Sequence, residues 1–268
     1  MFDNAAFNLG YLDTLSYRNT VLHRLDPRSK LVATLAFIIT VVSFPKYEIA
    51  GLLPFSLFPA IFFSMGDIPV RFIMKKVLVV STFALFIGIF NPLLDRQIVT
   101  SFLGLPISGG CISFLSIILK FFLTITAALL LIATTSFPGI CHALQKMGMP
   151  EIFVSQLLFL YRYIFVLVDE AMKIVRARDM RSFGRKGRGV KAFISLVGTL
   201  FLRTVERAER VYQAMLSRGF TGKLQTTKSF RFSSIDAAFL AGTGVILYCF
   251  RMYDVVDILG RFSMRIIG

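Results

Sequence analysis

The sequence predicts an all-α integral membrane protein, with about five transmembrane helices and two long cytoplasmic helices. Apolar residues make up 56% of the 268 residues and charged residues only 17%, whereas soluble domains hold about 45–50% apolar and about 25% charged residues. Apolar stretches of near-membrane length recur along the chain. Basic residues outnumber acidic residues by 30 to 15 and gather in particular connections, as expected of loops that stay in the cytoplasm.

Five apolar stretches are predicted to cross the membrane, because about 20 apolar residues are needed to cover about 30 Å of hydrocarbon. In chain order they are Leu31–Phe44, Ile49–Met65, Val77–Leu94, Cys111–Thr135 and Ile235–Phe250. The first stretch is short, and Asn91-Pro92 interrupts the third near its end.

Basic residues in the connections predict a cytoplasmic N-terminus. The connections before the first span and between the second and third hold Arg18, Arg24, Arg28, Lys30, Arg71, Lys75 and Lys76. The positive-inside rule places these connections in the cytoplasm. Five spans would leave Arg251, Arg261 and Arg265 on the other side. Either an apolar part of the middle segment re-enters the membrane, or the C-terminal tail is an exception to the rule.

Three parts are expected: residues 1–135 with four transmembrane helices, a cytoplasmic region over 136–234, and residues 235–268 with the last transmembrane helix and the tail. In the middle part, Gly148 and Pro150 are expected to end one helix and start another. One long helix is predicted from Glu151 to about Arg181, and another from about Val190 to Arg218. A glycine-rich break at Ser182–Gly189 separates them. At 1.5 Å per residue each helix is about 45 Å long, and we expect the two C-terminal ends to project to one surface.

Two arginine-centred triplets near the ends of these helices are the candidate functional residues: Ala177-Arg178-Asp179 and Ser217-Arg218-Gly219. Arginine at a helix C-terminus is favoured by the helix dipole, and its guanidinium can pair in bidentate fashion with a carboxylate on another protein. Small neighbours let a partner approach closely, and Gly219 is expected to end its helix. The competing interpretation is that both arginines are merely solvated.

Charged residues near or within the predicted spans are given structural roles. Asp26 is expected to cap a helix that begins at Pro27, while Arg28 and Lys30 anchor that helix at the cytoplasmic interface. Lys120 lies inside the fourth span, where a charge costs roughly 2.5–3.5 kcal/mol on insertion scales. We therefore expect Lys120 to face other helices or water, and favour a packing role over a place in a substrate path.

The sequence predicts no catalytic, cofactor-binding or metal-binding site. It contains no GxxxxGK[ST], HExxH or GxSxG motif, so any ATP that drives this protein is bound by a partner subunit. Cys111, Cys141 and Cys249 lack the CxxC spacing, and His23 and His142 are isolated. The basic excess is ascribed to anionic membrane lipid rather than to nucleic acid.

Two alternative function classes stay open at this point. A membrane-embedded enzyme that modifies anionic lipid would need paired carboxylates near a span end. The candidate pair is Asp169-Glu170, and adjacent residues point to different sides of a helix. A structural adaptor without energy coupling is the other alternative, and it would tolerate the loss of Arg178 and Arg218.

From about Tyr17 onwards, the chain resembles the transmembrane T component of energy-coupling factor transporters, the CbiQ/EcfT family. The stretches that carry the resemblance are His23–Leu31, Leu160–Ile164 with Asp169-Glu170-Ala171, the two arginine triplets, and Ala214–Phe220. The stretch from Leu160 to Ala171 is most similar to the cobalt-type branch, whose transporters take up Co²⁺ or Ni²⁺.

The resemblance implies a non-enzymatic scaffold in a bacterial or archaeal cell (inner) membrane, crossing it several times and joining a substrate-binding membrane subunit to two cytoplasmic ABC ATPase subunits. Arg178 and Arg218 match arginines that enter ATPase grooves from two coupling helices and meet acidic residues there. ATP-driven closure would tilt the substrate-binding subunit and release its cargo. Asp179 stands where glycine is usual in the family, and Ser217 where alanine is usual. A T component shared among vitamin-binding subunits is the chief alternative to metal uptake.

Overall fold

The computed structural model describes residues 15–18, 20–90, 98–102, 105–181, 189–222 and 232–252. Contacts divide these residues into two units. Residues up to 140, together with those from 232 onwards, form a unit that we call the bundle. Residues 141–222 form a unit dominated by two long helices, which we call the helix pair. The three-part division by residue number stays a prediction, and the contacts group the last helix with the first ones.

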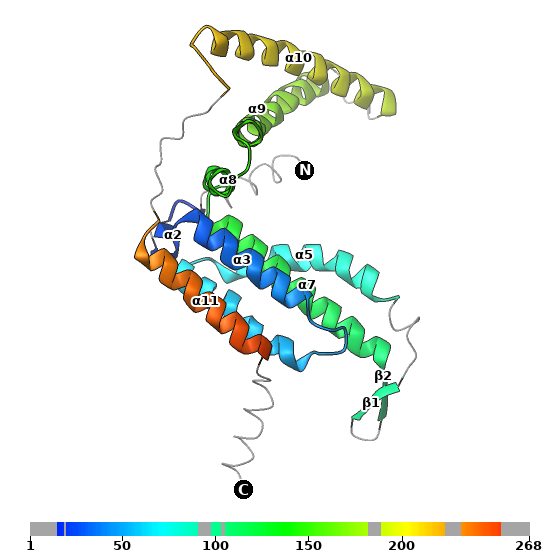
Figure 1. The fold of residues 1–268 in the computed structure, drawn as a ribbon. Helices are drawn as coiled ribbons and strands as arrows, with labels where there is room; N and C mark the ends of the chain where they lie inside the picture. Colours follow the sequence, from blue (N-terminus) through cyan, green and yellow to red (C-terminus); the bar gives the residue numbers. More distant parts are fainter. Residues whose placement is uncertain are drawn as a thin grey trace. The chain divides into compact units, whose positions relative to one another are not determined.

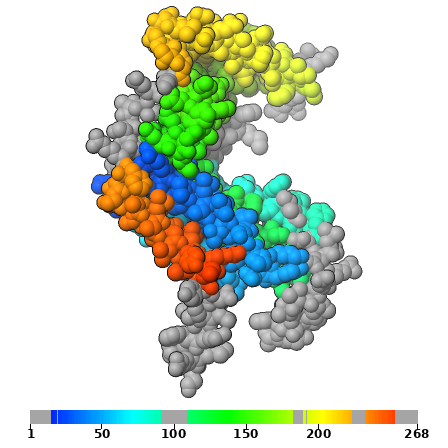
Figure 2. Space-filling model, viewed as in Figure 1, coloured from blue at the N-terminus to red at the C-terminus, as the bar shows by residue number. Residues whose placement is uncertain are grey.

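The bundle is built around one long central helix (Figure 1). Its elements are α2 (Val21–Arg24), α3 (Pro27–Val42), the 3₁₀ helix η1 (Ala50–Ser56), α4 (Leu57–Gly66), α5 (Val70–Gly88), α7 (Gly109–Thr134) and α11 (Ser234–Met252). The central helix α7 contacts α3, α4 and α5. Helix α11 lies along α3 on one face of the bundle, as Figure 2 also shows in orange and blue.

A short antiparallel hairpin precedes α7, and the sequence analysis did not predict it. Its strands are β1 (Ile98–Phe102) and β2 (Leu105–Ser108), with Phe102 opposite Leu105 and Thr100 opposite Ile107. The fold class is nevertheless the predicted one, an all-α membrane protein.

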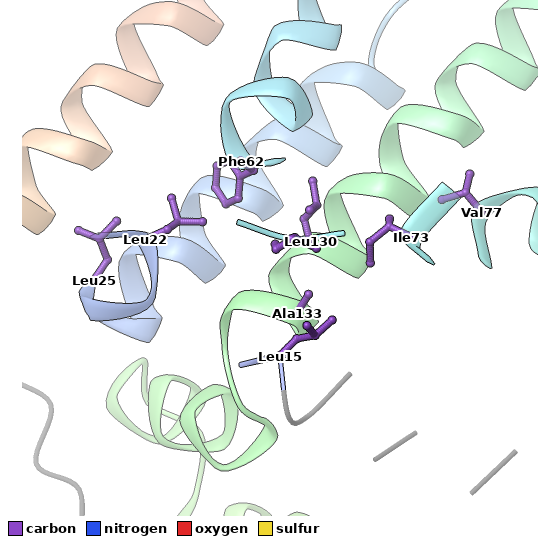
Figure 3. Packing of buried hydrophobic residues seen from close by; sticks show 9 residues of the cluster. Leu15, Leu22, Leu25, Phe62, Ile73, Val77, Leu130 and Ala133 are labelled. Atoms are coloured by element: carbon purple, nitrogen blue, oxygen red, sulfur yellow. The ribbon is translucent and has the colours of Figure 1, made fainter. Parts of the chain in front are cut away.

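Apolar side chains from several helices converge on two successive levels of α7. At one level Leu130 and Ala133 are fully buried (Figure 3). The other buried members of that cluster are Leu15, Leu22, Leu25, Phe62, Ile68, Ile73 and Val77. At the second level Leu123 and Ala127 pack with Phe37, Phe55 and their neighbours. A spacing of three to four residues places these α7 side chains on one face of the helix.

The helix pair follows the predicted boundaries closely. It comprises the end of α8 (Phe137–Lys146), then α9 (Glu151–Arg181) and α10 (Val190–Leu216). After α8, Gly148 adopts a φ of 105°, and the Met149 N–H donates to the Leu144 carbonyl at 3.1 Å. This closure is the Schellman motif, and it confirms the expected stop. The predicted break lies outside the described residues except for Gly189.

The helices that are long and apolar enough to cross a membrane match the five predicted spans in part. Among the described residues, three helices are long and apolar enough to cross a membrane: α7, α9 and α11. Helix α3 has 16 residues and α4 has 10, fewer than the roughly 20 required. The third predicted span starts earlier, at Val70, and its residues 91–94 lie outside the described part. Helix α9 holds the apolar part of the middle segment. Re-entry of this part into the membrane was one of the two explanations offered for the basic residues after the fifth predicted span.

Candidate functional site

The two arginine triplets lie on a pair of helices that pack in opposite directions. Near the middle of each helix, Arg203 Nη1 donates to Glu170 Oε1 at 2.7 Å. Beyond the end of α10, the Phe220 ring contacts the Phe159 ring edge-on, with 6.1 Å between centroids. Residue numbers therefore rise along α9 as they fall along the facing part of α10. The two helices form an antiparallel pair (Figure 1).

This geometry separates the two triplets. Arg178 lies eight residues past Glu170 on α9, and Arg218 lies fifteen residues past Arg203 on α10, in the opposite direction. At 1.5 Å per residue these offsets are about 12 Å and about 22 Å of helix, which puts the arginines roughly 25–35 Å apart. The expectation of one shared surface is thus replaced by two separate sites, one toward each end of the pair.

The second triplet coincides with the closure of α10. Gly219 adopts a left-handed φ of 77°; its N–H donates to the Leu216 carbonyl at 2.9 Å, and the Phe220 N–H donates to the Met215 carbonyl at 3.0 Å. Both bonds define a Schellman motif, so the expectation that Gly219 ends the helix is confirmed. The motif leaves Arg218 exposed at the turn.

The first triplet differs from the second in its electrostatics. Arg178 Nη2 and Nε donate to Asp179 Oδ1 at 2.8 Å and 3.2 Å, and about a third of the arginine side chain is exposed. Within the described part of the chain, the structure shows no ion pair for Arg218. Asp179 therefore occupies part of the guanidinium that a partner carboxylate would need, whereas Arg218 presents its charge to the surroundings.

The adjacent acidic residues Asp169 and Glu170 do not form a joint site. Asp169 is exposed, whereas the Glu170 side chain is mostly covered and pairs with Arg203 on the facing helix. The two carboxylates thus point to different sides of α9, as expected from the helical geometry. Among the described residues, no group of three His, Cys, Asp or Glu side chains is placed to hold a metal ion.

An apolar groove of about 460 Å³ runs between α9 and α10. Phe159, Tyr163 and Leu167 line it from α9, and Val211 and Met215 from α10. The same groove contains the edge-on contact made by Phe220, so the turn that carries Arg218 is fixed against the start of α9.

The family model described as CbiQ, cobalt transport protein, matches residues 18–228, a stretch that contains both arginine triplets. The chain belongs to the CbiQ family. Two relatives carry the name energy-coupling factor transporter transmembrane protein EcfT. The protein from Ruminiclostridium cellulolyticum is 29% identical over 234 residues, 81% of this chain and 87% of the relative. The protein from Listeria innocua is 30% identical over 227 residues, 76% of this chain and 82% of the relative.

A third relative is a putative fused cobalt transport protein CbiMQ from Methanocorpusculum labreanum, 38% identical over 90 residues, which are 33% of this chain and 15% of the relative. With the matches above, this CbiQ-family chain is the transmembrane T component of an energy-coupling factor transporter. It is a membrane protein that works in a complex with partner subunits, and a transport subunit rather than an enzyme.

The structure of this T component also contains a buried polar junction that the sequence analysis missed. Asp26 caps α3, because its Oδ1 accepts from the Arg28 N–H at 2.9 Å, as predicted. Asp236 joins the same site: its Oδ2 accepts from the Ser233 N–H at 2.8 Å, and its Oδ1 accepts from the Asp26 N–H at 2.7 Å. One carboxylate thus caps α11 and ties it to the start of α3.

Lys30 corrects an expectation. It was expected to anchor α3 at the cytoplasmic interface, but its residue is only 1% exposed, and its Nζ donates to the Thr134 carbonyl at 2.8 Å, where α7 ends. Asp26 and Asp236 are the carboxylates that act electrostatically on its ammonium group. The sequence offered one indication of this junction, an aspartate, Asp236, in the first turn of α11. That position alone does not reveal which helix the aspartate contacts.

Lys120 and Arg251 meet the other end of α3. Lys120 Nζ donates to the Phe44 carbonyl at 2.6 Å, and Arg251 Nη2 donates to the Ser43 carbonyl at 3.4 Å. Cations are favoured at helix C-termini because the carbonyls there carry partial negative charge. These bonds agree with the preferred packing or snorkelling role of Lys120, which stays a prediction. Arg251 lies at the same end of the bundle as the connection after α3.

Proposed function

We propose that this CbiQ-family protein transmits the ATP-driven motion of two cytoplasmic ABC ATPase subunits to a substrate-binding membrane subunit, in a bacterial or archaeal cell membrane. The observation that carries the proposal is the separation of Arg178 and Arg218 toward opposite ends of an antiparallel helix pair. Two separate arginine-centred sites suit two ATPase subunits, each of which would receive one helix end. The ATP is bound by those subunits, and this chain needs no cofactor of its own.

Each arginine would pair with a carboxylate of one ATPase subunit. A guanidinium forms two parallel hydrogen bonds with a carboxylate, and such pairs are stronger than neutral hydrogen bonds. Arg218 is exposed on a turn held by Gly219 and is ready for such a pair. Arg178 must first give up its ion pair with Asp179 before it can pair with a carboxylate of the ATPase subunit. The two sites are therefore expected to contribute unequally, with Arg218 contributing more.

The test is co-purification of the tagged chain with its ATPase subunits after co-expression of the whole transporter. Arg218→Ala should weaken association by about 2–5 kcal/mol, the usual cost of removing one member of a desolvated charge pair, and Arg178→Ala by less. The double variant should abolish transport while inserting normally into the membrane. Arg210→Ala and Arg181→Ala are the matched controls, because they remove the same charge from exposed positions on the same two helices.

Normal transport by the double variant would overturn the coupling role and leave a structural adaptor. Asp179→Gly offers a second measurement, since it frees Arg178 from its neighbour. It should strengthen ATPase association in the presence of Arg178 and have no effect on the Arg178→Ala background. An equal effect on both backgrounds would show that Asp179 acts without Arg178.

The groove between α9 and α10 is the surface that we assign to the substrate-binding membrane subunit. Most of its lining is aromatic or aliphatic, and Gln156, Thr204 and Arg207 also line it. A mostly apolar surface with a few polar groups suits contact with another membrane protein. Movement of the helix pair by the ATPases would then reach that subunit directly.

The cargo that we favour is Co²⁺ or Ni²⁺. The support is the description of the matching family as a cobalt transport protein, together with the fused cobalt transport relative. Uptake of radioactive Co²⁺ and of a vitamin by cells that express the chain with its partners distinguishes the two cargo classes. Vitamin uptake without metal uptake would make it a shared T component instead.

A further inference from the structure

A second groove, of about 330 Å³, lies within the bundle between α4 and α11. One wall is the face of α11 from Ala238 to Phe250, and the other runs along η1 and α4 from Phe55 to Met65. Apart from Thr243, every lining residue is apolar. Both walls belong to the bundle, and α11 is one of the helices that are long and apolar enough to cross a membrane.

The groove opens where α4 and α11 diverge. Helix α11 packs on α3 and meets η1 at one end of the groove, whereas α4 packs on α7. The walls meet at ring contacts near the two ends: Phe55 with Phe250 at 5.7 Å, and Phe62 with Phe239 at 6.2 Å between centroids. Between these contacts the α11 wall contains Gly242, which has no side chain. An added Cβ at Gly242 would meet no atom within 4 Å.

The length of the groove suits an extended acyl chain. Its wall from Ala238 to Phe250 covers twelve residue steps, or about 18 Å at 1.5 Å per residue. One leaflet of a bilayer has a hydrocarbon depth of about 15 Å. An extended acyl chain of one leaflet matches this length.

A cation stands at one end of the groove. Arg251 follows Phe250 directly, is exposed, and holds its guanidinium 4.3 Å from the Phe44 ring centre. One of its amino groups donates to the Ser43 carbonyl. A guanidinium carries five N–H donors, and the remaining ones suit the oxygens of a phosphate.

We propose that this groove binds one acyl chain of an anionic phospholipid, with the phosphate of that lipid on Arg251. The site is independent of the coupling role proposed above. The lipid would fill the gap between α4 and α11 and tie these two helices together.

The test uses the full chain, purified with its partner subunits from nanodiscs that contain phosphatidylglycerol and phosphatidylcholine in equal amounts. Lipid retained after detergent exchange is counted by native mass spectrometry. Gly242→Leu places a side chain in the groove and should reduce retained lipid roughly ten-fold, because several methylenes lose their burial. Gly244→Leu is the matched control: it lies on the same helix, also faces open space, and does not line the groove. It should retain lipid like the unaltered protein.

Ala238→Leu fills the groove near its other end. This second variant shows whether the loss of lipid in Gly242→Leu comes from filling the groove or from a local change in α11. It should also lower retention. Equal retention by the Gly242→Leu and Gly244→Leu variants would overturn the proposal. Unchanged lipid together with loss of the co-purified membrane subunit from the Gly242→Leu variant would also overturn it, because the groove would then belong to a protein partner.

The headgroup is tested separately. Arg251→Gln should remove the preference for phosphatidylglycerol over phosphatidylcholine, whereas Arg251→Lys should keep part of it. Arg71→Gln, an exposed arginine of α5 that does not line the groove, is the control and should leave the preference unchanged. An unchanged preference in the Arg251→Gln variant would overturn the assignment of the phosphate.

Discussion

The bundle and the helix pair treat their charged residues in opposite ways. In the bundle, Asp26 and Asp236 are buried at the starts of two helices, and Lys30 is buried at the end of a third. In the helix pair, Arg178 and Arg218 lie near helix ends, the first partly exposed and the second exposed. Arg203 of this unit pairs with Glu170 while more than half of its side chain stays exposed. Burial makes a charge structural, because it must be satisfied from within the protein. Exposure leaves a charge available to a partner.

The same helix-end electrostatics operate in both units. Carboxylates meet N–H groups at helix starts and cations meet carbonyls at helix ends, which lowers the energy of both groups. In the bundle this pairing joins α3, α7 and α11. In the helix pair Arg218 lies at such an end without an ion pair in the described part of the chain. The bundle thus uses its charges to join helices, whereas the helix pair leaves Arg218 available to another molecule.

Lys30→Met should give the largest loss of stability. It would leave the Thr134 carbonyl at the end of α7 without its buried donor and would remove the positive charge that acts on Asp26 and Asp236. An unsatisfied buried acceptor typically costs about 1–3 kcal/mol. The measurement is thermal unfolding of the purified chain in detergent. Lys75→Met removes a lysine of α5 that is exposed and should change the unfolding temperature little. Equal shifts in the two variants would show that the buried junction is not what joins the helices.

Gly219→Ala should have the next largest effect. Its φ of 77° is strained for any residue with a Cβ, so we expect a loss of about 1 kcal/mol and a displaced Arg218. Gly198→Ala, inside α10 and facing open space, should instead stabilise the helix by about 1 kcal/mol. Helix content and ATPase association of the two variants are to be compared. Weaker association in the Gly198→Ala variant would contradict a specific role of the turn.

The pair of Arg203 and Glu170 should contribute little. More than half of the arginine side chain is exposed, and exposed pairs give about 0.2–1 kcal/mol. A double-mutant cycle with Arg203→Ala and Glu170→Ala measures the coupling energy by thermal unfolding. A coupling energy as large as the effect of Lys30→Met would erase the contrast between the two units.

The smallest expected effect is a pH dependence of the stability of the protein, which arises from His23. Burial, and then the charge of Lys30, lower the pKa of His23 below its usual 6.5. The neutral ring satisfies two contacts: its Nε2 lies 3.1 Å from the Leu15 carbonyl oxygen, and its Nδ1 lies 2.7 Å from the Thr20 hydroxyl. The unfolded chain therefore binds the proton more readily, and stability should fall as the pH drops below about 6.5. His23→Gln should flatten this slope between pH 7 and 5, and an unchanged slope would assign it to other groups.

Much of the helix pair was predictable because its signals are local. Gly148 and Pro150 mark one boundary, Gly219 marks another, and α9 begins and ends at the predicted residues. A glycine that can adopt a positive φ ends a helix whatever surrounds it. Asp26 and Pro27 likewise specified the start of α3 through their own chemistry.

The sequence by itself determined the fold class, most of the helix boundaries and the two arginine triplets, since composition, periodicity and capping residues act over a few neighbours. Only the tertiary structure decided that the triplets lie toward opposite ends of an antiparallel pair, and that Lys30 is buried beside Asp26 and Asp236. Those outcomes depend on which helix meets which, over separations of 33 residues for Glu170 and Arg203 and 210 residues for Asp26 and Asp236. No local pattern records such a meeting, because the free energy that selects it comes from packing and charge pairing between distant segments.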